Sequence, residues 1–411
     1  MADWEQPADR PRRERGERGE RTRPQSVVPP NTRVLVVDDV AENRDLLVRR
    51  LTRLGCEKVT QAENGVEALA AIRGEQPDLV LLDIMMPEMN GYETLEALKA
   101  EGLLVNLPII VISALTEIDS VVRCIELGAE DYISKPFNPT LLRARVVSCL
   151  EKKRLRDESR KALERAQQDL LAARAMQLTM VPRAVPAPTP ALPLAMAALL
   201  RPALEVGGDL IDFFVLDGRR RAGVVLGDVS GKGAAAALFM ARTYSLVRSI
   251  AGSTDDPAAV LAEVNDLLAA NNELSMFVTL FLGLIDLDSG TVAYANAGHC
   301  PPYVLRADGR LERIGAIGGL ALAMMEGVPY RGGALTLGPG DTLVVYSDGV
   351  TEAMNPEHVL FEDARLEASL GEGPLPPPAL VERLVAAVDS HAAGAAQSDD
   401  IAVIAVNWAG G

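Results

Sequence analysis

The sequence offers little support for a disulfide framework or a zinc-type metal site. Its 411 residues include four cysteines, none in a C-x-x-C pair, and three histidines that lie far apart in the chain. Scattered cysteines in a long chain are typical of reduced core residues in a cytosolic protein. The histidine spacing excludes a helical zinc motif. We therefore expect a cytoplasmic protein without structural disulfides.

Long apolar runs are also absent. No run reaches the ~18 residues that a membrane span requires, and the N-terminus has no apolar signal core. The formal net charge is -16, from 57 acidic and 41 basic residues. Because so acidic a chain is repelled by phosphate backbones and anionic lipid, we expect neither nucleic acid nor a membrane as a partner.

The N-terminal part of the chain divides into a tail and a folded domain. Residues 1–30 are rich in Arg, Glu and Pro and nearly lack large apolar residues, which predicts a disordered tail. Binding of this tail to an acidic partner is the alternative. Over residues 31–150, five short apolar runs alternate with helical patterns. This alternation predicts a doubly wound α/β domain with a parallel five-stranded sheet.

A helical linker is predicted next, over residues 139–180, continuous with the last helix of the first domain. The stretch has no Gly, and its single Pro is at the start. Leu163, Ala166, Leu170 and Ala173 follow one another at alternating three- and four-residue steps, which indicates a coiled-coil seam and a homodimer formed through the linker. A single solvated helix is the alternative.

Residues 181–410 have a different pattern, with apolar alternation, short strands and fewer helices. The run LGLIDLDSGTVAYAN indicates a hairpin with its turn at Asp-Ser-Gly, and therefore an antiparallel sheet. We predict an α+β domain with helices packed on sheets. The Gly- and Ala-rich segment 311–333 is left without assigned strands. The predicted strands are 222–229, 276–287, 291–297, 302–306 and 342–347, and the predicted helices are 233–250, 257–271 and 377–390.

Polar side chains follow the strands of the first domain at one edge of its sheet. Asp38 and Asp39 come after the first predicted strand, Asp83 after the third, Ser113 at the end of the fourth and Lys135 after the fifth. Ligand sites in open parallel sheets lie at the carboxyl ends of strands. Three convergent carboxylates require a cation, and magnesium suits oxygen ligands. One carboxylate could then attack a phosphoryl group, which the lysine and the serine would neutralise and hydrogen-bond.

The motifs VLVVDD, LVLLDIMMPEMNG, IIVISA and DYISKPF resemble the receiver domain of two-component response regulators, over residues 33 to about 150. The resemblance implies that Asp83 is the phosphoacceptor and that a histidine kinase or phosphotransfer protein is the donor. It implies a cis peptide bond before Pro136. It further implies Mg²⁺ held by Asp38, Asp39, Asp83 and the Met85 carbonyl, a switch pair of Ser113 and Tyr132, and Lys135 as the phosphoryl contact.

A second group of acids lies beside glycines or strand ends in the C-terminal half. These are Asp209, Asp228, Asp348 and Asp399, with Asp400 adjacent to the last. Glycine beside an acid permits close approach of the backbone to a ligand. Because no histidine or cysteine accompanies them, the set suits magnesium or manganese, and two such ions could activate a water against a phosphoryl group.

The blocks MQLTMVP, EVGGDLIDFF, GDVSGKGAAAALFMA, GDTLVVYSDGVTEAMN and SDDIAVI resemble the PPM-type phosphatases of the SpoIIE/RsbU-like branch, in that family's order, over residues 172–408. The resemblance implies a sandwich of two antiparallel sheets flanked by helices. It implies two Mn²⁺ or Mg²⁺ ions held by the four aspartates above and the Val229 carbonyl. Whether Asp399 or Asp400 binds metal is left open. His299 and Cys300 are interpreted as structural.

The combined prediction is a response regulator whose phosphorylation controls a metal-dependent serine/threonine phosphatase. The branch resemblance implies a phosphorylated anti-sigma-factor antagonist as the substrate. The linker would carry control, and the sequence does not give its sign. The alternative is a phosphorylation-gated adaptor with a catalytically silent domain, for which loss of the metal acids would be the signature. A transcription factor is not supported, because no helix-turn-helix pattern is present.

Overall fold

The computed structural model describes residues 28–29, 31–114, 118–185, 187–216, 220–270, 272–315 and 318–410. Apart from Val28 and Pro29, the predicted tail 1–30 lies outside them. The chain forms two compact units, Met1–Leu163 and Glu164–Gly411, each of which has its own core. Among the described residues, no helix is both long and apolar enough to cross a membrane.

Unit 1 contains a parallel five-stranded sheet with the strand order β2-β1-β3-β4-β5. The predicted doubly wound domain is therefore confirmed. Its strands are β1 Arg33–Val37, β2 Lys58–Ala62, β3 Leu79–Leu82, β4 Ile109–Ser113 and β5 Asp131–Ser134. Its helices are α1 Ala41–Leu54, α2 Gly65–Glu75, α3 Gly91–Ala100, the 3-10 turn η1 Leu103–Val105, α4 Ile118–Leu127 and the start of α5 Pro139–Met180.

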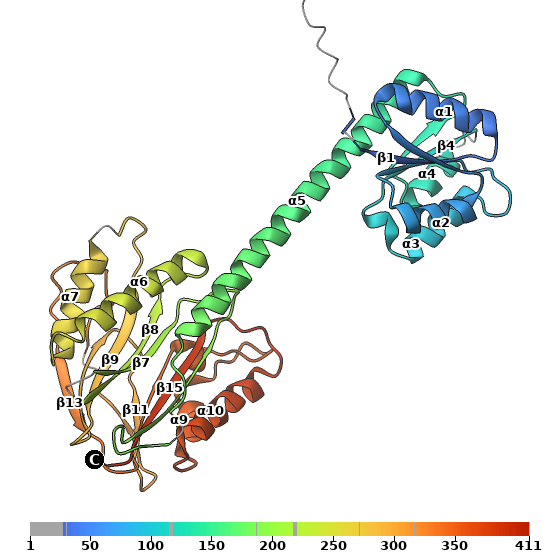
Figure 1. Ribbon diagram of the computed structural model, residues 1–411. Helices are drawn as coiled ribbons and strands as arrows, with labels where there is room; N and C mark the ends of the chain where they lie inside the picture. Colours follow the sequence, from blue (N-terminus) through green and yellow to red (C-terminus); the bar gives the residue numbers. More distant parts are fainter. Residues whose placement is uncertain are drawn as a thin grey trace, which may run out of the picture. The chain divides into compact units, whose positions relative to one another are not determined.

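Both faces of this sheet are buried, which explains why its strands are continuously apolar. Side chains of β1, β3 and β4 that face one way pack with α1 and α5, and those that face the other way pack with α2, α3 and α4. In β1, for example, Val34 and Val36 join the first core, whereas Leu35 and Val37 join the second. Figure 1 shows α2 and α3 together on one side of the sheet.

Helix α5 is continuous over 42 residues, as the predicted linker required. The predicted seam consists of four of its side chains. Leu163, Ala166 and Ala173 are exposed and Leu170 is half-buried. The predicted dimer through this seam stays a prediction.

Unit 2 is built from two antiparallel five-stranded sheets, with the orders β13-β10-β9-β8-β7 and β12-β11-β14-β15-β6. The strands are β6 Leu194–Arg201, β7 Leu210–Leu216, β8 Arg221–Val229, β9 Val278–Asp286, β10 Thr291–Ala297, β11 Tyr303–Leu305, β12 Leu311–Arg313, β13 Gly332–Thr336, β14 Thr342–Tyr346 and β15 Ile401–Trp408. The helices are α6 Ala234–Ile250, α7 Pro257–Ala269, α8 Asp348–Thr351, α9 Glu362–Gly371 and α10 Pro377–Ala392.

The two sheets pack face to face through a core that includes Phe281, Val304, Val345 and Ile404. Helices α6 and α7 cover the outer face of the first sheet, and α9 and α10 cover the outer face of the second, as Figure 1 shows. The predicted flanked sandwich is confirmed. The predicted hairpin at Asp-Ser-Gly is also present, where β9 pairs with β10.

Several elements were not predicted from the sequence. Strands β6, β7 and β15 and helices α8 and α9 were missed. The unassigned segment 311–333 contains β12 and the start of β13. Within it, Leu322 forms a bridge with Val278 that fixes the segment against β9.

Candidate functional sites

Three carboxylates of unit 1 converge at the carboxyl edge of the parallel sheet. Asp38 and Asp39 follow β1 and Asp83 follows β3, and one oxygen of each lies within 4.8 Å of the others. Asp38 and Asp83 are buried, whereas Asp39 is exposed. This oxygen set has the chemistry that Mg²⁺ prefers. The structure therefore brings together the three acids that were singled out in the sequence.

Lys135 lies directly against this cluster. Its Nζ donates to Asp38 Oδ2 at 2.7 Å and to Asp83 Oδ2 at 2.6 Å. Burial raises the pKa of Asp83, the Lys135 ammonium opposes that rise, and repulsion from Asp38 adds to it. Burial alone would lower the pKa of Lys135, but its two carboxylate partners raise it above its ordinary value. The lysine is therefore a fixed positive charge beside the Asp83 carboxylate.

Arg44, which was not predicted from the sequence, holds the loop that carries Asp38 and Asp39. Its guanidinium donates to the Asp38 carbonyl at 2.7 Å and to the Asp39 carbonyl at 3.2 Å, and it pairs with Glu63 at 2.5 Å. Asp38 Oδ1 accepts from the Val40 N–H at 3.0 Å. Arg44 is the fourth residue of α1, shortly after the two acids in the chain.

The other predicted residues of unit 1 lie around the cluster. Ser113 is fully buried at the end of β4, and a hydrogen bond with it opposes the rise in the pKa of Tyr132 that burial causes. Met85 follows Asp83 in the loop after β3, with an exposed side chain. The Lys135–Pro136 peptide bond is cis, as expected.

The acids of unit 2 come from both sheets of the sandwich. Asp209 precedes β7 and Asp228 lies near the end of β8, whereas Asp348 follows β14 and Asp399 precedes β15. These acids repel one another. Burial and then the Asp228 charge raise the pKa of Asp209 well above its ordinary value, and burial and then Asp399 raise that of Asp348. Burial, followed by Asp348 and Asp399, raises the pKa of Asp228 to about 7.

This arrangement fits divalent cations. Asp209 Oδ2 is buried and has no hydrogen-bond partner, as expected for an atom that a cation would contact. A Cβ on Gly208 would lie 2.7 Å from the Val229 carbonyl oxygen and 3.5 Å from Asp228 Oδ1, so only glycine permits this approach. Among the described residues, no three of these acids place ligand atoms all within 4.8 Å of one another.

The two adjacent acids, Asp399 and Asp400, have different surroundings. Both oxygens of the buried Asp400 carboxylate accept backbone N–H groups: those of Ala203 at 2.7 Å, Gly208 at 2.7 Å and Asp209 at 3.3 Å. The Asp399 side chain is 35% exposed and pairs with Lys232 Nζ at 3.1 Å. The Asp400 carboxylate therefore holds neighbouring backbone segments together. Asp399 uses one oxygen, Oδ1, which contacts Lys232 and accepts the Asp400 N–H at 2.8 Å.

Two further residues of this site were missed in the sequence. Lys232, between the glycines of GDVSGKG, donates to the Ser398 carbonyl at 2.5 Å and lies beside Asp399. Gln177 of α5 is buried and exchanges two hydrogen bonds with the backbone of Gly207. A lone cation between glycines is a recognisable signal. Gln177 lies in the block MQLTMVP, which resembles the same family as the EVGGDLIDFF block, but the sequence does not show that its side chain contacts Gly207.

His299 and Cys300, which were interpreted as structural, lie in the loop between β10 and β11. His299 is buried, and its Nδ1 lies 2.9 Å from the Thr279 hydroxyl. Burial lowers the pKa of His299 to about 4, so the ring is neutral at physiological pH. A neutral, enclosed imidazole fits a packing role.

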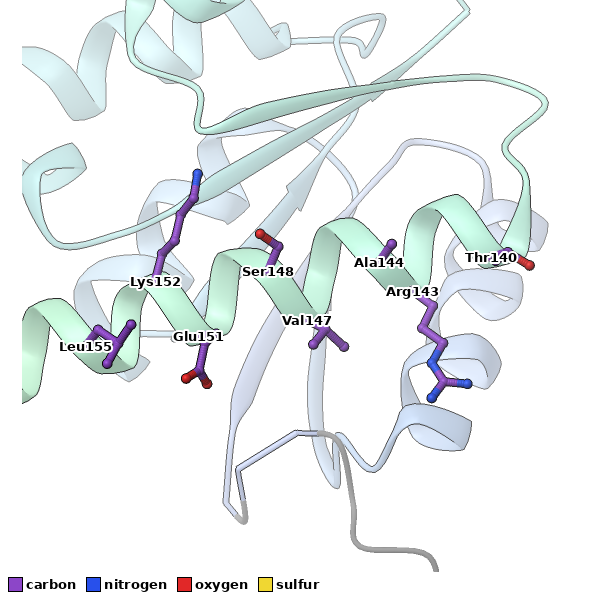
Figure 2. Close-up of a pocket in the computed structure, with 8 residues that line it drawn as sticks. All are labelled: Thr140, Arg143, Ala144, Val147, Ser148, Glu151, Lys152 and Leu155. Carbon is purple, nitrogen blue, oxygen red and sulfur yellow. The ribbon is translucent and has the colours of Figure 1, made fainter.

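A hollow of about 550 Å³ lies along the first turns of α5, and none of its lining residues belongs to either acid cluster. Figure 2 shows Arg143, Val147 and Glu151 leaving the same side of the helix. One helix supplies all of the residues that line the hollow.

Comparison with known proteins assigns each unit to a family. Residues 34–147 match the response regulator receiver domain, and residues 218–409 match the family described as stage II sporulation protein E. Protein IcfG of Synechocystis sp. is 32% identical over 236 residues, which are 51% of this chain and 37% of that protein. The probable transcriptional regulator ycf27 of Pyropia yezoensis is 45% identical over 120 residues, which are 29% of this chain and 48% of that protein.

Among solved structures, the SiaA-PP2C domain of Pseudomonas aeruginosa superposes with a TM-score of 0.51 and 21% identity, over 60% of this chain and 98% of that one. At this identity the likeness shows the fold of unit 2. The chain spans about half or less of the length of the curated relatives named above. The chain therefore joins a response regulator receiver domain, over residues 34–147, to a PP2C-type phosphatase domain of the SpoIIE family, over residues 218–409.

Proposed function

We propose that this chain is a response regulator in which Asp83 accepts a phosphoryl group and thereby controls hydrolysis of protein phosphoserine or phosphothreonine by unit 2. The observation that supports the proposal best is the pair of acid clusters, one in each unit. Each contains buried carboxylates whose charges have too few cationic partners among the described residues. The proposed domain limits are 31–150 and 181–410, with 139–180 as the linker.

In unit 1, the proposed step is attack of an Asp83 oxygen on the phosphorus of a phosphohistidine in a kinase or phosphotransfer protein. The nitrogen–phosphorus bond breaks as the oxygen–phosphorus bond forms. Lys135 Nζ, already 2.6 Å from Asp83 Oδ2, would neutralise the phosphoryl oxygens. Asp38, Asp39, Asp83 and the Met85 carbonyl are the proposed Mg²⁺ ligands. Ser113 and Tyr132 are the proposed switch pair.

In unit 2, Asp209, Asp228, Asp348, Asp399 and the Val229 carbonyl are the proposed ligands of two Mn²⁺ or Mg²⁺ ions. When bound, such ions supply the positive charge that polarises a phosphate ester and activates water. Asp400 is assigned a structural role, because its oxygens are used by backbone N–H groups. By fixing where such ions would bind, these acids would set the positions of the reacting water and the phosphoryl group for in-line displacement.

The proposed substrate is a phosphorylated anti-sigma-factor antagonist, following the family resemblance of unit 2. The proposed dimer forms through the exposed seam of α5. A cytoplasmic location fits a chain that receives phosphoryl groups from a kinase and keeps its four cysteines unpaired.

The test is Mn²⁺-dependent hydrolysis of a chromogenic phosphate ester and of a phosphoserine protein. Asp228→Ala should abolish turnover, whereas Asp308→Ala, in an exposed hairpin of the same unit, should leave it unchanged. Turnover that survives Asp228→Ala would contradict the assignment. Absence of turnover by the unaltered chain with both substrates would contradict the proposed enzyme and favour the alternative, a phosphorylation-gated adaptor.

A further inference from the structure

The backbone of Gly207, Gly208 and Asp209 lies outside the sheets, since β7 begins at Leu210. Its conformation is fixed by two buried side chains from distant parts of the chain. Asp400 accepts the N–H groups of Gly208 and Asp209. Gln177 uses both ends of its amide on Gly207: its Nε2 donates to the Gly207 carbonyl at 3.0 Å, and its Oε1 accepts the Gly207 N–H at 3.1 Å.

The Gln177 pair is well placed to set geometry. The side chain is 4% exposed, and a buried amide is stable only when its donor and acceptor are both satisfied, as they are here. A Cβ on Gly207 would lie 2.1 Å from Asp400 Oδ2, so the loop fits closely between the two side chains. Gln177 and Asp209 also line the same small cavity, of about 10 Å³.

The end of α5 is attached at successive turns. Arg174 donates to the Leu204 carbonyl at 3.5 Å, Gln177 binds Gly207, and Met180 packs against the core that includes Leu210. We propose that Gln177 is a positioning residue for the metal site of unit 2, acting through the backbone of Gly207–Asp209 on the Asp209 carboxylate. The inference rests on the proposed role of Asp209 as a metal ligand.

The pair is sensitive to small movements of the helix. A hydrogen bond at 3.0 Å is lost when its partners separate by about 0.6 Å or more. Because the amide contacts the backbone two residues before Asp209, such a movement would displace the Asp209 carboxylate. Residues that orient metal ligands in this way typically contribute about 10- to 100-fold to metal affinity or activity.

The test compares Gln177→Met, which keeps the volume and removes both hydrogen bonds, with Gln168→Met, an exposed change on the same helix. We expect Gln177→Met to raise the Mn²⁺ concentration for half-maximal turnover by about 10- to 100-fold, with turnover at saturating Mn²⁺ largely restored. Amide hydrogen exchange in a peptide spanning 204–210 should be faster in metal-free Gln177→Met by about fivefold. Gln168→Met should resemble the unaltered chain in both measurements.

Equal Mn²⁺ dependence in Gln177→Met and Gln168→Met, even with a lower melting temperature, would overturn the inference and leave Gln177 a packing residue. If Gln177→Met does not fold, Gln177→Glu keeps the acceptor and loses the donor, and it should give a smaller shift of the same sign. A folded Gln177→Glu chain with no shift would also overturn it.

Failure of the proposed function is distinguishable from failure of this inference. Absence of turnover in the unaltered chain removes the proposed enzyme. Mn²⁺ binding, followed by the magnetic resonance signal of the free ion, and exchange at 204–210 remain independent of turnover. Unit 1 contributes the same Mn²⁺ binding to both variants, so a difference between them reports on unit 2.

Discussion

Substitution of the adjacent acids Asp399 and Asp400 should have opposite consequences, although the two differ by one position in the sequence. Asp400 is 5% exposed and accepts three backbone N–H groups. In Asp400→Asn, one oxygen remains and an NH₂ group faces a backbone donor. Losing one or two charge-assisted hydrogen bonds and leaving a buried donor unpaired costs about 2–4 kcal/mol.

For a unit of this size, 1 kcal/mol corresponds to about 2–4 °C in melting temperature, so Asp400→Asn should melt about 5–15 °C lower. In Asp399→Asn, the lost partner is a half-exposed lysine, and pairs of that kind contribute about 0–1 kcal/mol. Its melting temperature should change by only about 4 °C or less. Its Mn²⁺ affinity should fall by about 100-fold or more, because a ligand is lost and not only a residue that orients one.

The assay combines calorimetry of the metal-free proteins with Mn²⁺ titration of phosphate release. The predicted result is a low melting temperature with recoverable turnover for Asp400→Asn, and a near-normal melting temperature with lost metal affinity for Asp399→Asn. Normal Mn²⁺ affinity in Asp399→Asn, or an unchanged melting temperature in Asp400→Asn, would refute the assignment of the two roles.

Three further predictions concern pH, packing and the receiver. Burial raises the pKa of Asp212 to about 6, and burial with repulsion from Asp348 and Asp399 raises that of Asp228 to about 7. At these two carboxyls the folded chain holds more protons than the unfolded chain between about pH 4 and pH 7, whereas at His299, whose pKa is lowered to about 4, it holds fewer below about pH 6.5. Because two carboxyls outweigh one imidazole, the metal-free protein should melt at a lower temperature as pH rises through that window. A rise with pH would contradict this. Gly349→Ala should destabilise unit 2 by about 1–3 kcal/mol or more, because its Cβ would lie 1.9 Å from the Asp400 carbonyl oxygen. The control is Gly371→Ala, whose Cβ would meet nothing within 4 Å and which should be neutral or slightly stabilising. Denaturant titrations measure both free energies of unfolding. Lys135→Met should reduce acetyl-phosphate labelling of Asp83 by about 10- to 100-fold, since it removes two charged hydrogen bonds, and unchanged labelling would contradict the role of the lysine.

Unit 1 was predictable because its signals are local. Runs such as LVLL at 79–82 are buried on both faces, and the acids follow the strands directly. The strands missed in unit 2 lack such signals. β6, with the sequence LAMAALLR, has the composition of a helix and becomes a strand because it pairs with β15 over eight residues. Pairing with β15 determines its conformation, and the sequence of β6 alone does not indicate that pairing.

The same limit applies to the site. The aspartates beside glycines could be picked out because glycine next to an acid is visible in sequence. The distinction between Asp399 and Asp400 could not be made, because it depends on N–H groups contributed by residues almost 200 positions earlier. Arg44 and Gln177 were missed for a related reason, since both act on backbone carbonyl or N–H groups, which every residue has.

The central claim is that phosphorylation of Asp83 controls phosphatase activity in the same chain. The most direct measurement is phosphate release from a phosphoserine protein at fixed Mn²⁺, with and without beryllofluoride, for the unaltered chain and for Asp83→Asn. Turnover that beryllofluoride changes severalfold in the unaltered chain, and not in Asp83→Asn, is the predicted result. Equal rates in all four conditions would contradict control by the receiver.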